Sequence, residues 1–386
     1  MHTHMRSRLT RLARVVLAAV VAVAVAVPAA ARPAVAVGAV PQTAPSFNGS
    51  VYAIAARGDT VYVGGSFTAA IVAGKQVARQ RLAAFDARTG ALLAWAPTAD
   101  ATVRALAADD VGVYAGGDFG VVSGVRRDSL ARLDPVSGAV GSFAHQVGGV
   151  PLSLAVGNGR LYTAGTFTDI DGAARAHVAA FALSTGALDP GWTAGTDDTV
   201  YALAVVGERV YLGGSFHKAN NVSSTLRLTA VTATTGAVVT TFKPSPPAVV
   251  YGIAVDAAGV YAAMGGQGGR AAAYTSTGAL RWLRVFDGDA QSIAVLAGTV
   301  YVGGHFDRAC TTNNNGPQGV CTDGSVSRIK FAAITATGTL SGWAPQANGI
   351  VGVRTLLSDP AHGTVSAGGD FTTIGGLPCK RYASFG

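Results

Sequence analysis

The amino-acid sequence predicts an all-β fold, a seven-bladed β-propeller of four-stranded antiparallel blades, on three observations. A short motif that ends in a glycine pair and a phenylalanine recurs along the chain. Four short strand-like segments accompany each copy, and a turn that ends in glycine separates the last two of them. Regular repeats of this size indicate a repeat architecture, and four-stranded units set around an axis protect their sheet edges by radial repetition.

The recurring motif gives the number of repeats. Its first copy reads VYVGGSFT at 61–68, and later copies read VYAGGDFG, LYTAGTFT, VYLGGSFH, VYVGGHFD and VSAGGDFT. The interval between copies is mostly about 50 residues, with one double interval. That interval contains VYAAMGGQGG at 260–269, which we interpret as a further copy that keeps the glycines and has lost the phenylalanine. The motif phenylalanines are Phe67, Phe119, Phe167, Phe216, Phe306 and Phe371.

The first repeat shows the four segments as VYAIAARG, TVYVGGSF, RLAAFD and ALLAWAP. They are short, rich in valine, leucine, alanine and aromatic residues, and partly alternating, which is typical of strands. The turn before the fourth segment ends in glycine, as in DARTG at 86–90, and so suits a backbone with positive φ. The aromatic residues that follow this turn are predicted to pack between blades: Trp95, Phe143, Trp192, Phe242 and Trp343.

The glycine pair itself could be taken for a phosphate-binding loop. A P-loop needs glycines that open a helix, followed by Lys and Ser or Thr. VGGSFT opens no helix and has no adjacent lysine. We therefore expect a structural role, in which glycines at the end of the second strand let neighbouring backbones approach closely.

The two ends of the chain carry parts of one repeat. The segment Phe385–Gly386 aligns with 85–86, so the last repeat lacks its fourth segment, and residues 43–55 align with 95–107. We therefore expect the N-terminal strand to complete the last blade. The predicted blades span residues 51–100, 101–149, 150–198, 199–248, 249–288, 289–348, and 349–386 plus 39–47.

Residues 1–31 are predicted to be a signal peptide. Arginines precede an apolar run from Val15 to Val27, and the small residues up to Ala31 offer a cleavage site. The run is too short to cross a hydrocarbon core of roughly 30 Å, and no cysteine for lipid attachment lies near the cleavage site. We expect secretion by the general secretory pathway, one propeller domain over residues 32–386, and no membrane anchor.

Charge and composition exclude some classes of function. The formal net charge of +8 falls to about +4 once the arginines of the signal peptide are removed. The remaining basic residues are scattered, whereas nucleic-acid binders cluster them on one face, so we expect no nucleic-acid partner. Glu208 is the only glutamate, which excludes any mechanism that needs two.

Two kinds of known repeat resemble this chain. The segments GGDFTTIGGLPCKRYASF at 368–385 and AGTFTDIDGAARAHVAAF at 164–181 resemble the delta-60 repeats of bacterial β-propellers. The half-repeat LAAFDARTGALLAW at 82–95 is similar to pyrroloquinoline-quinone-type propeller repeats. The resemblance implies blades and an extracellular protein, as in actinobacteria, without implying an active site. A quinone-type dehydrogenase remains a lesser alternative, since it would want a calcium site, a catalytic Asp in a central funnel and commonly eight blades. No cofactor is expected.

Function is expected where the repeats differ, on the face that carries the loops between second and third strands. This loop is short in the fifth repeat and longest in the sixth, DRACTTNNNGPQGVCTDGSVSR at 307–328. The asymmetry predicts a notch over the fifth blade, with His305, Asp307 and Arg308 as candidate ligand-binding residues. The alternative is that Asp and His near the motif phenylalanines only fix turns by hydrogen bonds to backbone. The residues concerned are Asp118, Asp169, Asp171, His217, His305, Asp307, Arg308 and Asp370.

All three cysteines of the chain lie in these loops. Secretion permits disulfides, and a bond between Cys310 and Cys321 would close a short loop. Cys379 is then a free thiol or a competitor for one of the other two. No metal site is predicted, because the spacing is not that of a zinc site.

Two classes of function remain. The leading one is a non-enzymatic binding or scaffold module for an extracellular protein or a cell-wall polysaccharide, and we expect a monomer. The alternative is an extracellular hydrolase or lyase that uses Asp and His residues of the loop face. No catalytic residue can be singled out, because a fold that joins distant loops hides such constellations.

Overall fold

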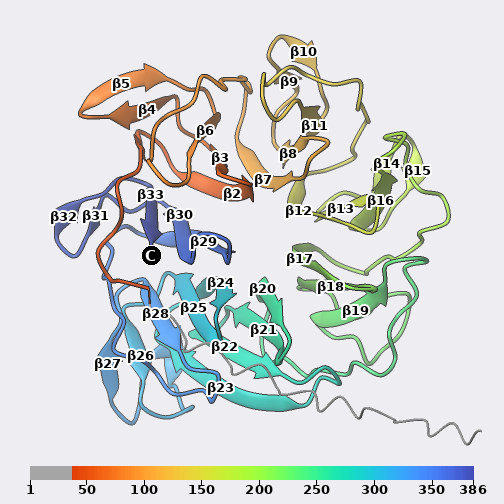
Figure 1. Cartoon of the computed structure of the whole chain (residues 1–386). Helices are drawn as coiled ribbons and strands as arrows, with labels where there is room; N and C mark the ends of the chain where they lie inside the picture. Colours follow the sequence, from red (N-terminus) through yellow and green to blue (C-terminus); the bar gives the residue numbers. More distant parts are fainter. Residues whose placement is uncertain (1–36) are drawn as a thin grey trace, which may run out of the picture. The chain divides into compact units, whose positions relative to one another are not determined.

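Antiparallel hairpins of one design are arranged around a common axis (Figure 1). The computed structural model describes residues 37–386, so the predicted signal peptide and residues 32–36 lie outside the described part. Within residues 37–386 the only helix is a short 3₁₀ turn, Pro317–Gly319. No helix of that part is long and apolar enough to cross a membrane.

In seven sheets of the described chain, three strands lie side by side in the order in which they occur in the sequence. We call them the first to seventh repeat sheets. The first strand of each, the inner strand, lies nearest this axis in Figure 1. Their strands are β2 (Val51–Arg57), β3 (Thr60–Gly65) and β6 (Leu82–Asp86); β7 (Val103–Ala108), β8 (Val113–Gly117) and β11 (Leu130–Leu133); β12 (Pro151–Gly157), β13 (Arg160–Gly165) and β16 (Val178–Ala182); β17 (Val200–Val206), β18 (Arg209–Gly214) and β19 (Leu228–Thr232); β20 (Val250–Asp256), β21 (Gly259–Met264) and β22 (Gly269–Tyr274); β24 (Ala290–Leu296), β25 (Thr299–Gly304) and β28 (Phe331–Ile334); β29 (Val353–Asp359), β30 (Thr364–Gly369) and β33 (Tyr382–Phe385).

The fourth segment of a repeat is a full strand only in the fifth sheet, where β23 (Leu280–Phe286) pairs with β22. In the first sheet it is reduced to one bridge, Phe85 to Leu92, and the second, third, fourth and sixth sheets have equivalent single bridges. Beside β33 of the seventh sheet, the N–H of Gly38 donates to the carbonyl of Gly386 at 2.9 Å. The N–H of Gln42 donates to the carbonyl of Ser384 at 2.7 Å in the same way.

Short ribbons occupy the loops between second and third strands. The longest belongs to the sixth repeat, and its β26 pairs with β23 of the fifth sheet through Ala309 and Phe286. The ribbon strands are β4 (Ala69–Val72) and β5 (Lys75–Ala78); β9 (Val121–Val122) and β10 (Val125–Arg126); β14 (Asp169–Ile170) and β15 (Ala173–Ala174); β26 (Arg308–Cys310) and β27 (Ser325–Ser327); β31 (Thr373–Ile374) and β32 (Leu377–Pro378). A further short strand, β1 (Ser46–Phe47), precedes the first inner strand and pairs with β4.

An aromatic pair fills the space beside six of the repeat sheets. In the first sheet the rings of Tyr62 and Trp95 lie edge to face with centroids 5.1 Å apart. Burial of such large rings is a main source of stability in a core. The predicted packing role is confirmed for Trp95, Phe143, Trp192 and Phe242, which are buried, while Trp343 is half-buried against Tyr301. The pairs are Tyr62–Trp95, Tyr114–Phe143, Tyr162–Trp192, Tyr211–Phe242, Tyr261–Trp282 and Tyr301–Trp343.

The glycine pair has the structural role that the sequence predicts. A Cβ added to Gly65 would overlap the carbonyl oxygen of Ser50, which lies just before the inner strand. A Cβ on Gly64 would come 2.5 Å from the side chain of Val103 in the next sheet. At Gly65 only glycine therefore fits against the neighbouring backbone, and at Gly64 a small residue lets the next sheet approach closely.

The fifth copy of the motif differs from our sequence interpretation. In β21 it is Met264 that pairs with Val250, the place where the first sheet pairs Gly65 with Val51. The glycines of VYAAMGGQGG therefore lie beyond the strand, so this copy does not keep the pair.

Candidate functional site

A β-bulge interrupts each inner strand at its second residue. In the first sheet, Val51 pairs with Gly65 and Ala53 with Gly64, so Tyr52 is left without a partner. A bulge of this kind re-aims the side chain of its extra residue. The same shift occurs in all seven inner strands. The extra residues are Tyr52, Arg104, Leu152, Tyr201, Tyr251, Gln291 and Arg354, and they line one pocket of about 200 Å³.

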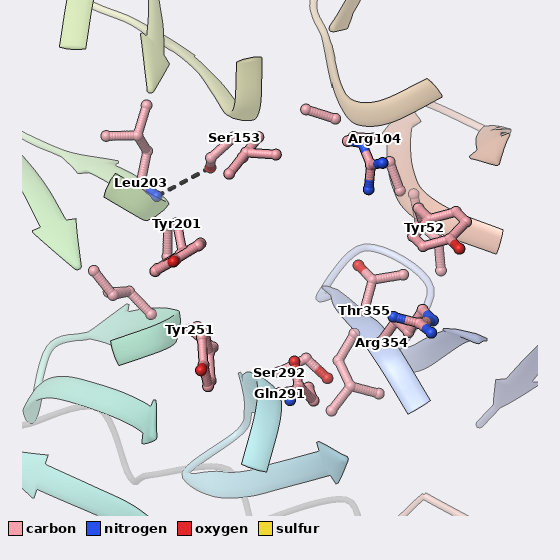
Figure 2. Close-up of a pocket in the computed structure, with 18 of the residues that line it drawn as sticks. Tyr52, Arg104, Ser153, Tyr201, Leu203, Tyr251, Gln291, Ser292, Arg354 and Thr355 are labelled. Atoms are coloured by element: carbon pink, nitrogen blue, oxygen red, sulfur yellow. Dashed lines mark hydrogen bonds between the residues drawn. The ribbon is translucent and has the colours of Figure 1, made fainter. Parts of the chain in front are cut away.

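We call the part of this central pocket that the seven side chains line the axial mouth, and Figure 2 shows a close-up of the pocket. Because Val51 pairs with Gly65, the last residue of β3, the bulges lie at the end where each second strand leads into its loop. The axial mouth therefore belongs to the loop face, the face on which the sequence predicts function.

One side of the axial mouth is cationic. The guanidinium carbons of Arg354 and Arg104 lie 5.0 and 5.8 Å from the ring centroid of Tyr52. Arg104 Nε also donates to Asp118 Oδ1 at 2.7 Å, and this hydrogen bond raises the pKa of Arg104. The buried Nε of Arg354 has no hydrogen-bond partner within residues 37–386. Arg104 is therefore neutralised, whereas Arg354 is not.

The opposite side is aromatic. Figure 2 shows Tyr201 and Tyr251 together across the opening from Tyr52, and their rings meet edge to face with centroids 5.3 Å apart. Burial raises the pKa of Tyr251, and the nearby charge of Asp289 raises it further. The phenol of Tyr251 therefore stays neutral near pH 7 and can donate a hydrogen bond.

The chemistry of the axial mouth is hydrogen bonding, charge and ring contact. None of the residues that line it is Asp, Glu, His or Cys. In the described part of the chain, no group of three or more such side chains is placed to hold a metal ion.

Comparison with known proteins gives the fold. No protein-family model matches the sequence, and no curated protein matches it. The WD40 β-propeller domain of Doa1 superposes with a TM-score of 0.56 at 13% identity, over 90% of this chain and 96% of that chain. The described chain is a β-propeller. The computationally designed protein Ika8 is also similar, with a TM-score of 0.46 and 15% identity over 88% of this chain and 98% of its own. At such identities the likeness shows the fold of the propeller alone.

The residues that the sequence singles out lie elsewhere on the propeller. His305 is exposed, Asp307 Oδ1 lies 2.9 Å from Lys330 Nζ, and Arg308 Nη1 donates to Ser325 Oγ at 3.1 Å. Lys330 Nζ also donates to the carbonyl of His305 at 2.9 Å. The structure thus brings Asp307 and His305 to Lys330, and none of the three candidates lines the axial mouth.

The predicted notch over the fifth repeat is occupied by the sixth-repeat loop. Asn315 Nδ2 donates to the carbonyl of Gln267 at 2.5 Å, and Gln267 Nε2 donates to that of Gly316 at 3.3 Å. Arg270 Nη2 donates to Asn315 Oδ1 at 3.3 Å. The loop therefore lies on the short turn instead of only walling it, because side-chain hydrogen bonds join the two segments.

The predicted disulfide is confirmed. Cys310 and Cys321 are bonded, with Cα atoms 5.2 Å apart, and Cys379 is free. Burial raises the pKa of the Cys379 thiol to about 11. This thiol is therefore protonated near pH 7 and a poor nucleophile.

Turn fixation is carried out mainly by residues that sequence reasoning missed. In five repeats an Asn or Asp before the inner strand accepts the N–H groups of the two residues after the motif phenylalanine. Asp287 Oδ1, for example, accepts those of Asp307 and Arg308 at 2.8 and 2.9 Å. We call these residues the clamp residues: Asn48, Asp100, Asp197, Asp287 and Asn348.

A signal for the axial mouth is present in the sequence. The inner segments keep small or branched apolar residues around their second position, as in VYAIA and VRALA. That second position changes from Tyr to Arg, Leu or Gln between repeats. A variable position within a regular strand marks a side chain that the core does not constrain.

Proposed function

We propose that this chain is a secreted, non-enzymatic binding module whose axial mouth holds an acidic sugar of an extracellular polysaccharide. The observation that carries the proposal is the guanidinium of Arg354, which lies over the ring of Tyr52 and whose Nε has no hydrogen-bond partner within residues 37–386. Arg104 lies near the same ring and already has Asp118 as its partner. An anion in the mouth would supply the missing partner of Arg354.

Electrostatics favours a carboxylate at this place. Arginine binds carboxylates through two parallel N–H groups, and such charge-assisted bonds are about twice as strong as neutral ones. Residues of all seven repeat sheets surround the mouth, so the attraction is less screened than on an open surface. Its lining includes no carboxylate that would repel the ligand.

The aromatic side favours a sugar over a small inorganic anion. Tyr201 and Tyr251 present ring faces and hydroxyls about the opening, with Gln291 next along the wall (Figure 2). Rings offer apolar contact to the C–H groups of a sugar, while hydroxyl and amide groups fix its orientation. A uronic acid at a chain end combines both requirements.

The proposed architecture is a closed ring of seven four-stranded blades. The seven repeat sheets support the blade number, and the single bridges to the fourth segments support four segments for each blade. The hydrogen bonds of Gly38 and Gln42 to the last strand support closure by the N-terminal segment. Secretion rests on the N-terminal sequence, and the disulfide is compatible with it.

Binding of uronic-acid oligosaccharides, measured by calorimetry against neutral oligoglucans of equal length, tests the proposal. We expect the acidic oligomers to bind and Arg354→Gln to weaken them by about tenfold or more. Lys75→Gln removes an equal charge from the exposed ribbon β5 and should leave affinity unchanged. Equal binding of acidic and neutral oligomers, or an unaffected R354Q variant, would refute the proposal.

The same assay compares the other candidate surface. Replacement of His305, Asp307 and Arg308 by Ala should leave the affinity for acidic oligomers unchanged if the axial mouth is the site. Chromatography of the oligomers after long incubation tests the hydrolase or lyase alternative. Release of shorter products by the wild-type protein would establish that alternative in place of pure binding.

A further inference from the structure

A second pocket, of about 350 Å³, lies between the seventh and first repeat sheets. We call it the closure pocket. Its walls come from β29, β30 and β33 of the seventh sheet, from β2, β3 and the turn after β6, and from the N-terminal segment at 42–44. It is separate from the axial mouth, with which it shares no residue.

The closure pocket exists because one aromatic pair is missing. Six repeats place a tyrosine of the second strand against an aromatic ring of the fourth segment. In the seventh sheet Ser366 stands in β30 where Tyr62 stands in β3, since Ser366 pairs with Ser384 as Tyr62 pairs with Ala84. Residues TAP at 43–45 align with WAP at 95–97, so Thr43 replaces the tryptophan.

The walls of this pocket still suit an aromatic ring. Phe85, Val61 and Leu357 supply apolar surface. Its volume exceeds that of an engineered apolar cavity of about 150 Å³ that binds benzene, and it falls within the range of small-molecule sites, roughly 300–1,000 Å³. The six filled repeats show that a planar ring is the shape which this position between sheets accepts.

The polar groups of the pocket are neutral or already paired. The hydroxyl of Tyr382 shares a 2.7 Å hydrogen bond with Ser366 Oγ, and burial raises the pKa of Tyr382 to about 12. At the rim Arg88 pairs with Asp59 at 3.0 Å, and Asp359 pairs with His362 at 2.7 Å. A charged ligand would find no free counter-charge here, whereas a neutral hydroxyl or N–H would find acceptors.

The filled repeats show which backbone carbonyl accepts a hydrogen bond from the aromatic ring. The indole N–H of Trp95 donates to the carbonyl of Asp134, in the turn of the next sheet, at 2.9 Å. Trp192 donates to the carbonyl of Thr232 in the same way at 3.1 Å. The equivalent turn beside the closure pocket is 86–90, in which Asp86 stands where the second repeat has Asp134. A bound ring with an N–H or O–H group can donate to a backbone carbonyl of this turn.

We propose that the closure pocket binds a neutral planar aromatic molecule of the indole or phenol class, in the place of the missing tyrosine and tryptophan pair. Such a ligand would contact both the seventh and the first repeat sheets, so its binding would stabilise their junction.

Indole and p-cresol are the probes, with binding measured by calorimetry and by the shift of the melting temperature of the full secreted chain. We expect both to bind wild type, and Thr43→Trp to weaken them by about tenfold or more because the new ring occupies the pocket. Ser366→Tyr should do the same from the opposite wall. Thr43→Ser leaves the space open and should keep the affinity of wild type.

The filled variants also report on folding, since T43W and S366Y should melt at or above the temperature of wild type. Absence of probe binding to wild type at millimolar concentration would overturn the proposal. Equal affinity in wild type and both filled variants would overturn it as well, because the probe would then bind elsewhere, such as between Tyr201 and Tyr251. Difference density for indole beside Thr43 in a soaked crystal would support it.

Discussion

The Nε2 atom of His362 lies 2.8 Å from Oδ1 of Asp59, which joins the turn after β29 to the turn after β2. Its other ring nitrogen lies 2.7 Å from Asp359 Oδ2, and the side chain is only 11% exposed. The hydrogen bonds to Asp359 and then Asp59 raise the pKa of His362 above 6.5. The hydrogen bond from Arg88, followed by that from His362, lowers the pKa of Asp59 below 3.8.

These shifts predict a pH window for the junction of the seventh and first sheets. The contribution of His362 is fully present below pH 6.5 and is lost as pH rises through its raised pKa. The contribution of Asp59 is present above pH 3.8 and is lost as pH falls through its lowered pKa. Melting curves should therefore show that His362→Gln lowers the melting temperature more at about pH 5 than at about pH 9. A variant penalty that is the same at both pH values would contradict this.

The second glycine of the motif should be intolerant of any side chain. Gly65→Ala would force a Cβ against the Ser50 carbonyl, so we expect a loss of about 1–3 kcal/mol or more in the free energy of unfolding. Urea titration measures it. Gly342→Ala is the control, since a Cβ there meets nothing within 4 Å and should change little. A stable G65A protein would mean that the strand end shifts freely.

The clamp residues should stabilise the propeller through the side-chain oxygen that accepts backbone N–H groups. Asn48 Oδ1 accepts the N–H groups of Thr68 and Ala69, each at 2.9 Å. Asn48→Ala leaves these donors without a protein partner and should lower the free energy of unfolding by about 1–2 kcal/mol. Asn48→Asp keeps the acceptor that other repeats use at this position and should cost less. Equal losses in the two variants would show that the carbonyl acceptor is not what matters.

Sequence patterns predicted the propeller, the role of the glycines and the disulfide because each depends on local rules. The role of Gly65 can be predicted from steric limits at the end of a strand. The Cys310–Cys321 bond joins residues that are close in the chain. The axial mouth was missed because its seven residues meet only in the folded propeller, each contributed by a different repeat. The occupied notch was missed because contacts such as Asn315 to Gln267 depend on how one loop lies across its neighbour.

The disulfide should stabilise the sixth-repeat loop more than the propeller core. In the chain-entropy model a loop of this length gains about 2–3 kcal/mol from the bond. The double variant Cys310→Ser, Cys321→Ser should therefore be cleaved first within residues 311–320 in limited proteolysis, while Cys379→Ser should keep the wild-type pattern. An unchanged cleavage pattern in the double variant would show that contacts such as that of Asn315 with Gln267 hold the loop alone.

The N-terminal segment should be essential for stability if it closes the ring. Val37 and Phe47 are buried, and the ring of Phe47 lies 4.6 Å from that of Phe67. The carbonyl of Gly38 also accepts the indole N–H of Trp343 at 3.0 Å. Burial of the two apolar side chains alone is worth about 3–6 kcal/mol. A chain that begins at residue 48 should therefore melt well below one that begins at residue 37.

The single variant Phe47→Ala should melt between these two chains, because it loses the ring contact and keeps the backbone hydrogen bonds of Gly38 and Gln42. Equal melting temperatures for the two chain starts would mean that the ring holds without this segment.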